Sequence, residues 1–80
     1  MPHYLFNIRI GDALIEDPDG RELRDPDQAW EAARALARDL LRDHHGRRDV
    51  LAAAVEVMDD AGEVVLEFPV LEALDPTATH

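Results

Sequence analysis

The chain has 80 residues, with 18 acidic and 8 basic side chains and a formal net charge of −10. Because proteins bind DNA and RNA largely through positive charge that displaces counterions, this balance argues against nucleic acid as a partner. No run reaches the roughly 20 apolar residues of a membrane-spanning helix and no signal peptide is recognisable, so we expect a cytoplasmic protein without membrane contact.

The first predicted element is a β-hairpin at the N-terminus. Apolar and polar side chains alternate through residues 3–10, a period typical of a strand. Gly11-Asp12 then supplies a two-residue turn, because glycine readily adopts a positive φ. This turn pairs Ile8 with Ile15, and it places the apolar pairs of both strands on one face.

A turn and a helix follow. The sequence Asp17-Pro18-Asp19-Gly20 is typical of a turn, in which proline fixes φ and glycine accepts a left-handed conformation. Asp25 can cap the next helix, with Pro26 at its first position and Gln28 completing a capping box. Apolar side chains then recur at helical spacing, and Gly46 is the expected stop. The apolar stripe consists of Ala29, Trp30, Ala33, Leu36, Ala37, Leu40 and Leu41.

The remaining chain predicts a second hairpin, with strands over residues 51–58 and 63–68. A four-residue loop would place Val57 opposite Val64 and keep the apolar side chains of both strands on one face. A three-residue loop would bring apolar residues against acidic ones. We therefore favour the four-residue loop.

These elements predict one α+β domain over residues 1–74, in the order ββαββ. The expected sheet is four-stranded and mostly antiparallel, with one helix packed across one face. Leu71 and Leu74 indicate a short final turn, and residues 75–80 indicate a frayed C-terminal tail. The pattern leaves the order of the strands in the sheet open.

Several of these segments resemble a family of short bacterial proteins that is classed as a domain of unknown function. The resemblance rests on the opening Pro2-His3-Tyr4-Leu5-Phe6, the Asp17–Gly20 turn followed by Glu22-Leu23, the alanine-rich helix and the Val55–Gly62 hairpin. It extends from Pro2 to Leu74. It implies the fold, and it implies no activity, cofactor or site residue.

Residues that could carry catalysis are few. The chain has no cysteine and no serine, and both threonines lie in the tail, so a covalent nucleophile is missing. The acids Glu56, Glu63 and Glu67 are expected on the solvent side of the sheet, where no carboxyl pKa would be raised by burial. We therefore expect neither an enzyme nor a bound cofactor.

Metal binding is also not expected. His44 and His45 would point about 100° apart on a helix, and His3 or His80 could join them only if both chain ends folded over the helix terminus. The acids around Asp17 lack the twelve-residue pattern of a calcium loop. A ligand pocket lined by Trp30 and the histidines is the least favoured functional hypothesis.

The face of the sheet opposite the helix is the candidate interaction surface. Four sizeable apolar side chains are expected there among polar ones, and they form a possible interface: Leu5, Leu14, Met58 and Val65. A small, alanine-rich core without disulfides favours self-association as a source of stability. The leading hypothesis is therefore a non-enzymatic interaction module that forms a homodimer.

The charge suggests an alternative. An acidic regulator, or an antitoxin-like protein, could mask a basic protein partner. A basic flank on the helix side, formed by Arg34, Arg38, Arg42, Arg47 and Arg48, allows two interpretations. These arginines either offset nearby carboxylates, or they form a polarised surface for a partner or a second copy.

Overall fold

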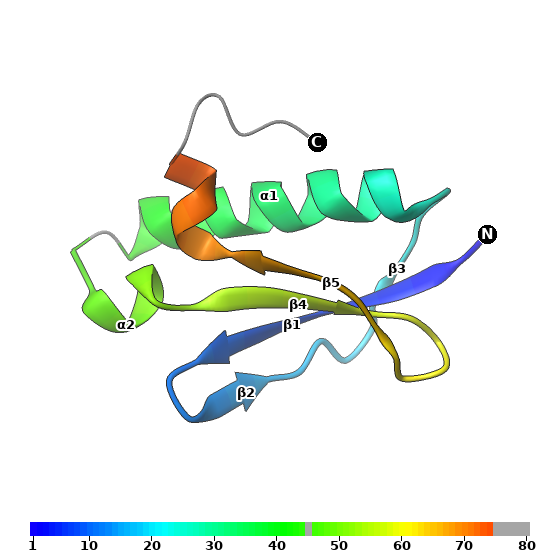
Figure 1. The fold of residues 1–80 in the computed structure, drawn as a ribbon, viewed down its shortest axis with the longest axis horizontal. Coiled ribbons are helices and arrows are strands. Elements are labelled where there is room, and N and C mark those ends of the chain that lie inside the picture. The colour runs from blue at the N-terminus through cyan, green and yellow to red at the C-terminus, as the bar shows by residue number, and fades with distance from the viewer. Residues whose placement is uncertain (45, 75–80) are drawn as a thin grey trace.

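The structure is a computed structural model, and it describes residues 1–44 and 46–74. The predicted α+β class is confirmed, with an antiparallel sheet and one main helix packed against it (Figure 1). The expected frayed tail, residues 75–80, lies outside the described residues. The elements are β1 (His3–Ile10), β2 (Ala13–Ile15), β3 (Arg21–Glu22), α1 (Pro26–Asp43), α2 (Arg48–Leu51), β4 (Ala54–Met58), β5 (Val64–Pro69) and the 3-10 helix η1 (Val70–Leu74).

The sheet is organised around β1. Its main path runs β2-β1-β4-β5, and β3 also pairs with β1. All of these pairings are antiparallel. One edge of β1 therefore carries β4, and the other edge is shared by β2 and β3. The sequence pattern missed β3 because a strand of two residues is too short to show a period.

The first hairpin agrees with the sequence analysis. Ile8 lies opposite Ile15 and Ile10 opposite Ala13. Gly11 has a φ of 56°, whereas no other type of residue in the described chain has a positive φ. A positive φ at the first turn position alone is characteristic of a type II′ turn, whose twist matches that of the flanking strands.

The loop of the second hairpin corrects the prediction. The Asp59 N–H donates to the Glu63 carbonyl at 2.9 Å, and the Gly62 N–H donates to the Asp59 carbonyl at 3.1 Å. Gly62 has a φ of 80°. These contacts define a three-residue loop with glycine at its left-handed position, which is a common hairpin connection. The predicted four-residue loop is wrong.

A β-bulge explains why the correct loop looked unfavourable. Met58 pairs with Val64, but Val57 pairs with Leu66, so Val65 is an extra residue between the two pairs. A bulge shifts every later side chain of the strand by one position. The shift returns Phe68 to the buried face, while Val64, which we expected there, is 55% exposed.

The start of the second hairpin also differs. β4 begins at Ala54, three residues later than predicted, because the preceding residues form the short helix α2. Val50, which is 2% exposed, anchors this helix in the core. The Val70 N–H donates to the Ala53 carbonyl at 2.9 Å, which ties the start of η1 to the residue that precedes β4. The expected turn at Leu71 and Leu74 is this 3-10 helix.

Helix α1 begins as its cap predicts. The Asp25 carboxylate accepts the Gln28 N–H at 2.9 Å, and the Gln28 side chain accepts the Arg24 N–H at 2.7 Å. Three alanines of the helix are fully buried: Ala29, Ala33 and Ala37. Such small residues let the helix backbone approach the sheet closely. Half-buried side chains then flank them, and the ring of Trp30 packs edge-on against Phe68 with 5.5 Å between the ring centroids.

Gly20, immediately before β3, packs tightly against β1. Its φ is 70°, and a Cβ atom there would lie 2.6 Å from the Tyr4 carbonyl oxygen and 2.5 Å from Nε2 of His3. The left-handed conformation alone costs a larger residue about 1–2 kcal/mol. A clash with backbone adds to that cost, because a strand cannot move aside freely.

We expect Gly20→Ala to lower the free energy of unfolding by about 3 kcal/mol or more in urea denaturation. The matched control is Gly62→Ala, at a φ of 80° with open space around the added Cβ. It should cost only about 1–2 kcal/mol. Equal losses for the two variants would contradict the close approach of Gly20 to β1.

Candidate functional site

The four predicted interface residues do not form one continuous patch. Leu5 of β1 and Met58 of β4 are direct cross-strand partners, and both are half-buried. Leu14 is 42% exposed on β2, on the far side of β1 from Met58. Val65, which we expected on the open face, packs against the core because of the bulge. The structure therefore brings together only Leu5 and Met58.

Polar side chains occupy much of the open face. Glu56 is only 8% exposed, so the prediction that it is solvated is wrong, whereas Glu63 and Glu67 are exposed as expected. Arg9 covers Glu56 from the neighbouring strand, with 2.9 Å between Nη2 and Oε2. The hydrogen bond and the charge of Glu56 raise the pKa of Arg9. This face thus holds a structural ion pair.

Asn7 is the second buried polar residue of this face. Its side-chain oxygen accepts the Asp17 N–H at 2.9 Å, and its Nδ2 contacts the sulfur of Met58 at 3.2 Å. Asn7 therefore fastens the loop after β2 to the centre of the sheet. Sequence patterns did not indicate this role, because the partners lie 10 and 51 residues away.

The Asp17 carboxylate fills a break along one edge of β1. It accepts the N–H groups of Phe6, Asp19 and Gly20 at 3.0–3.2 Å. Its partial burial favours a higher pKa, but these hydrogen bonds and the charge of Arg21 outweigh that effect, so the pKa of Asp17 lies below its ordinary value. The carboxylate therefore acts as an ionised structural acceptor.

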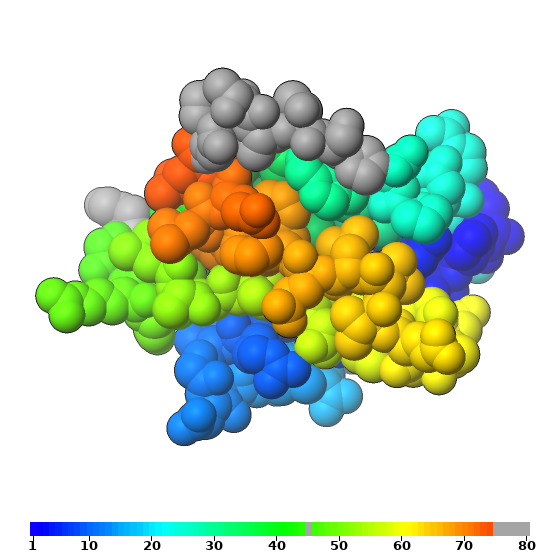
Figure 2. All heavy atoms as spheres, in the orientation of Figure 1, coloured from blue at the N-terminus to red at the C-terminus, as the bar shows by residue number. Residues whose placement is uncertain are grey.

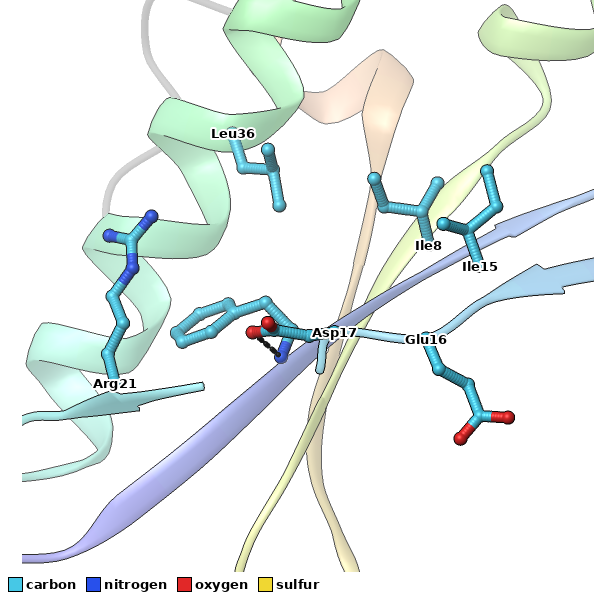
Figure 3. A pocket seen from close by; sticks show the side chains of 7 residues that line it. Ile8, Ile15, Glu16, Asp17, Arg21 and Leu36 are labelled. Atoms are coloured by element: carbon cyan, nitrogen blue, oxygen red, sulfur yellow. Dashed lines mark hydrogen bonds between the residues drawn. The ribbon is translucent and has the colours of Figure 1, made fainter. Parts of the chain in front are cut away.

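An open apolar groove of about 260 Å³ lies between the first hairpin and α1 (Figure 3). Apolar side chains from the sheet and the helix line it, and Arg21 stands over the Phe6 ring at 5.3 Å from its centroid. Charged side chains lie at its border. The lining consists of Phe6, Ile8, Ile15, Glu16, Asp17, Arg21 and Leu36. Neither Trp30 nor a histidine takes part, so the pocket that the sequence suggested is not this one.

The groove exists because α1 does not cover the whole sheet. The helix contacts β4, β5 and η1, and β2 lies at the opposite end of the strand order. All three residues of β2 are exposed, and Ile15 is 53% exposed. The β1–β2 hairpin protrudes from the rest of the molecule (Figure 2). The alternation had indicated that Ile15 faces the helix side, but not that the helix falls short of it.

The arginine flank is partly neutralised. Arg42 forms ion pairs with Asp39 and Asp43, and Arg47 pairs with Asp49. These contacts favour the simpler interpretation, in which the arginines offset nearby carboxylates. All of these side chains are largely exposed, so each pair contributes little to stability.

The described histidines lie apart from one another in sequence and structure. His3 is half-buried beside Gly20, and His44 is exposed at the C-terminal end of α1. His45 and His80 lie outside the described residues. Within residues 1–44 and 46–74, no group of three or more His, Cys, Asp or Glu side chains is placed to hold a metal ion. Over the same residues, no helix combines the length and apolar character needed to cross a membrane.

The Asp17 contacts predict a pH-dependent contribution to stability. A folded-state pKa below the unfolded value of about 3.9 means that the contribution is complete above about pH 5 and is lost as the pH falls through the folded value. We expect Asp17→Asn to lower the free energy of unfolding at pH 7 by about 1 kcal/mol, since the side chain is partly solvated. The difference from wild type should shrink at pH 2–3. Urea denaturation at both pH values measures it.

The control for this prediction is Asp60→Asn, an exposed residue of the second hairpin loop. It should change the stability at pH 7 by less than about 0.5 kcal/mol. A stability loss for Asp17→Asn that stayed constant from pH 7 to pH 2 would contradict the role of the charged carboxylate.

Comparison with known proteins adds a family but no activity. We find no match among curated proteins and none among solved structures. A family described as a domain of unknown function, DUF6894, matches residues 3–72, which include every described strand and helix except the last residues of η1. The chain therefore belongs to the DUF6894 family of domains of unknown function.

Proposed function

We propose that the protein is a small, non-enzymatic interaction module of the cytoplasm that binds another protein chain through its first hairpin. The observation that carries this proposal is the exposed β2 strand, Ala13-Leu14-Ile15, beside an open apolar groove. Exposed, adjacent apolar side chains on a soluble domain are typical of interaction sites. The site lies at the end of the sheet that α1 leaves uncovered.

The polar groups near this site support a binding role rather than catalysis. Asp17 uses its carboxylate to accept backbone N–H groups. Glu56 is engaged by Arg9 on the other face. Both carboxylates are therefore committed to holding the fold. What remains at the surface is shape, apolar area and charge, which are the properties that recognise a partner chain.

Site-specific photo-crosslinking tests the proposal. A photoreactive amino acid in place of Leu14, expressed in the native cells, should give a defined covalent adduct with a partner protein after illumination. The same amino acid in place of Leu71, which is 51% exposed on η1, is the matched control and should give none. The absence of a specific adduct at position 14 would overturn the proposal.

Self-association is a second candidate, favoured by a different surface. Leu5 and Met58 adjoin on the open face, and the exposed Val64 lies opposite Met58. Together they form a small apolar cluster that a second copy could cover. The cluster is limited in area, and most stable dimers bury about 800 Å² on each partner.

Sedimentation velocity tests this homodimer. If it forms, the 9.0 kDa chain should sediment as a dimer at micromolar concentration, and Val64→Gln should shift it to the monomer. Leu71→Gln is the matched control, with an exposed fraction of 51% against 55% for Val64, and should leave the dimer intact. A wild-type protein that stays monomeric at all concentrations would remove this candidate.

A further inference from the structure

The two edges of the sheet differ in how well they resist pairing with another strand. β5, at one end of the strand order, carries a bulge, the charged Glu67 and, at its end, Pro69, which has no N–H. Charges, bulges and proline are the usual means by which natural proteins block an edge. β2, at the other end, reads Ala13-Leu14-Ile15 and has none of these features within the strand. The β2 edge is therefore the one that can accept a further strand.

The backbone N–H and carbonyl of Leu14 are oriented to pair with such an added strand. In an antiparallel pair, hydrogen-bonded and non-hydrogen-bonded residue pairs alternate. The Phe6 N–H points to the side of β1 that carries β2, because it donates to Asp17 there. Ile8 and Ile10 point the same way and form the hydrogen-bonded pairs with β2, so the Leu14–Arg9 pair is the non-hydrogen-bonded one. The N–H and carbonyl of Leu14 therefore face outward from the sheet.

The charges around β2 indicate what kind of strand fits. Asp12 precedes β2 and Glu16 follows it, and both are exposed. If a second copy paired antiparallel with β2 about Leu14, Asp12 of one chain would lie opposite Glu16 of the other, and like charges placed opposite one another are destabilising. A strand with basic residues on both sides of an apolar centre would form ion pairs at both positions.

We infer that the β2 edge binds an extended, basic-flanked segment of another protein by strand addition. This inference rests on the proposed function and names the partner's chemistry. The added segment pairs with the outward N–H and carbonyl of Leu14. One of its apolar side chains, on the helix side, lies next to Ile15 at the mouth of the groove. Its basic ends face Asp12 and Glu16.

A labelled peptide tests the inference on the full-length protein. The probe is an acetylated, amidated seven-residue peptide in which two lysines at each end flank Val-Thr-Val, so that with threonine opposite Leu14 the valines lie on the helix side and a lysine faces each of Asp12 and Glu16. Fluorescence anisotropy measures its binding at low and at physiological salt. The lysine-flanked peptide should bind, and raising the salt should weaken it. A peptide with glutamates in place of the lysines should bind about tenfold weaker or not at all.

Charge reversal on the protein supplies the matched test. The double variant Asp12→Lys/Glu16→Lys changes two exposed residues and should exchange the preference, so that the glutamate-flanked peptide binds more tightly. If the preference stays with lysine, or if neither peptide binds the wild-type protein, the inference is overturned.

The backbone contact has its own test. Leu14→Pro removes the outward N–H without removing a hydrogen bond to β1 and should abolish binding, whereas Leu14→Thr keeps the N–H and should retain most of it. Equal losses would mean that side chains rather than strand pairing bind the peptide, which overturns strand addition. A specific adduct at position 14 in cells, together with no peptide binding, would retain the interaction module and reject the basic-flanked strand.

Discussion

The rest of the structure depends on one shared edge of β1. β4 pairs along the other edge, but this edge must serve two short strands, β2 and β3, with a gap between them. A backbone N–H left unpaired in such a gap would cost free energy comparable to a lost hydrogen bond. The Asp17 carboxylate fills the gap by accepting the Phe6 N–H, and Asn7 holds the Asp17 backbone from the face of the sheet. These contacts end β2 at Ile15 and direct the chain towards β3.

The position of α1 follows from a second constraint, the small side chains that it buries. Ala29, Ala33 and Ala37 let the helix lie close to the sheet, and Trp30 fixes it over Phe68 of β5. A single helix held there cannot also cover β2. The surface that remains uncovered is a consequence of how this core is built, and its apolar side chains, Ile15 above all, are what the fold offers to a partner.

Local chemistry made part of this structure predictable. The turn at Gly11, the cap at Asp25 and the apolar stripe of the helix each involve residues within a few positions of one another, and all three were inferred correctly. The second hairpin was inferred incorrectly because two deviations compensate each other. A shorter loop moves the pairing by one residue, and the bulge at Val65 moves it again. Beyond the bulge, the predicted and the observed pairings place the side chains of β5 on the same faces of the sheet. The alternation of side chains therefore cannot distinguish the two pairings.

The candidate site was harder to predict because it depends on distant contacts. The sequence identified Leu5, Leu14, Met58 and Val65 as apolar residues on an open face, but the ion pair between Arg9 and Glu56 spans 47 residues. No periodicity indicates such a pair. The groove, likewise, depends on where α1 ends relative to β2. Alternation can place Ile15 on a face, but it cannot establish whether another element covers that face.

The acidity of the chain and its exposed edge are best understood together. An edge strand with apolar side chains on both faces is a hazard, because copies of the protein could pair through it. Within β2 no charge, proline or bulge blocks pairing with another copy. The acids at each end of the strand, Asp12 and Glu16, oppose that pairing instead. Within a population of identical chains, each with a net charge of −10, these acids repel the same edge of another copy. In the strand addition that we propose, the same charges would attract a basic strand, so the feature that limits self-pairing at β2 would also select a partner of opposite charge.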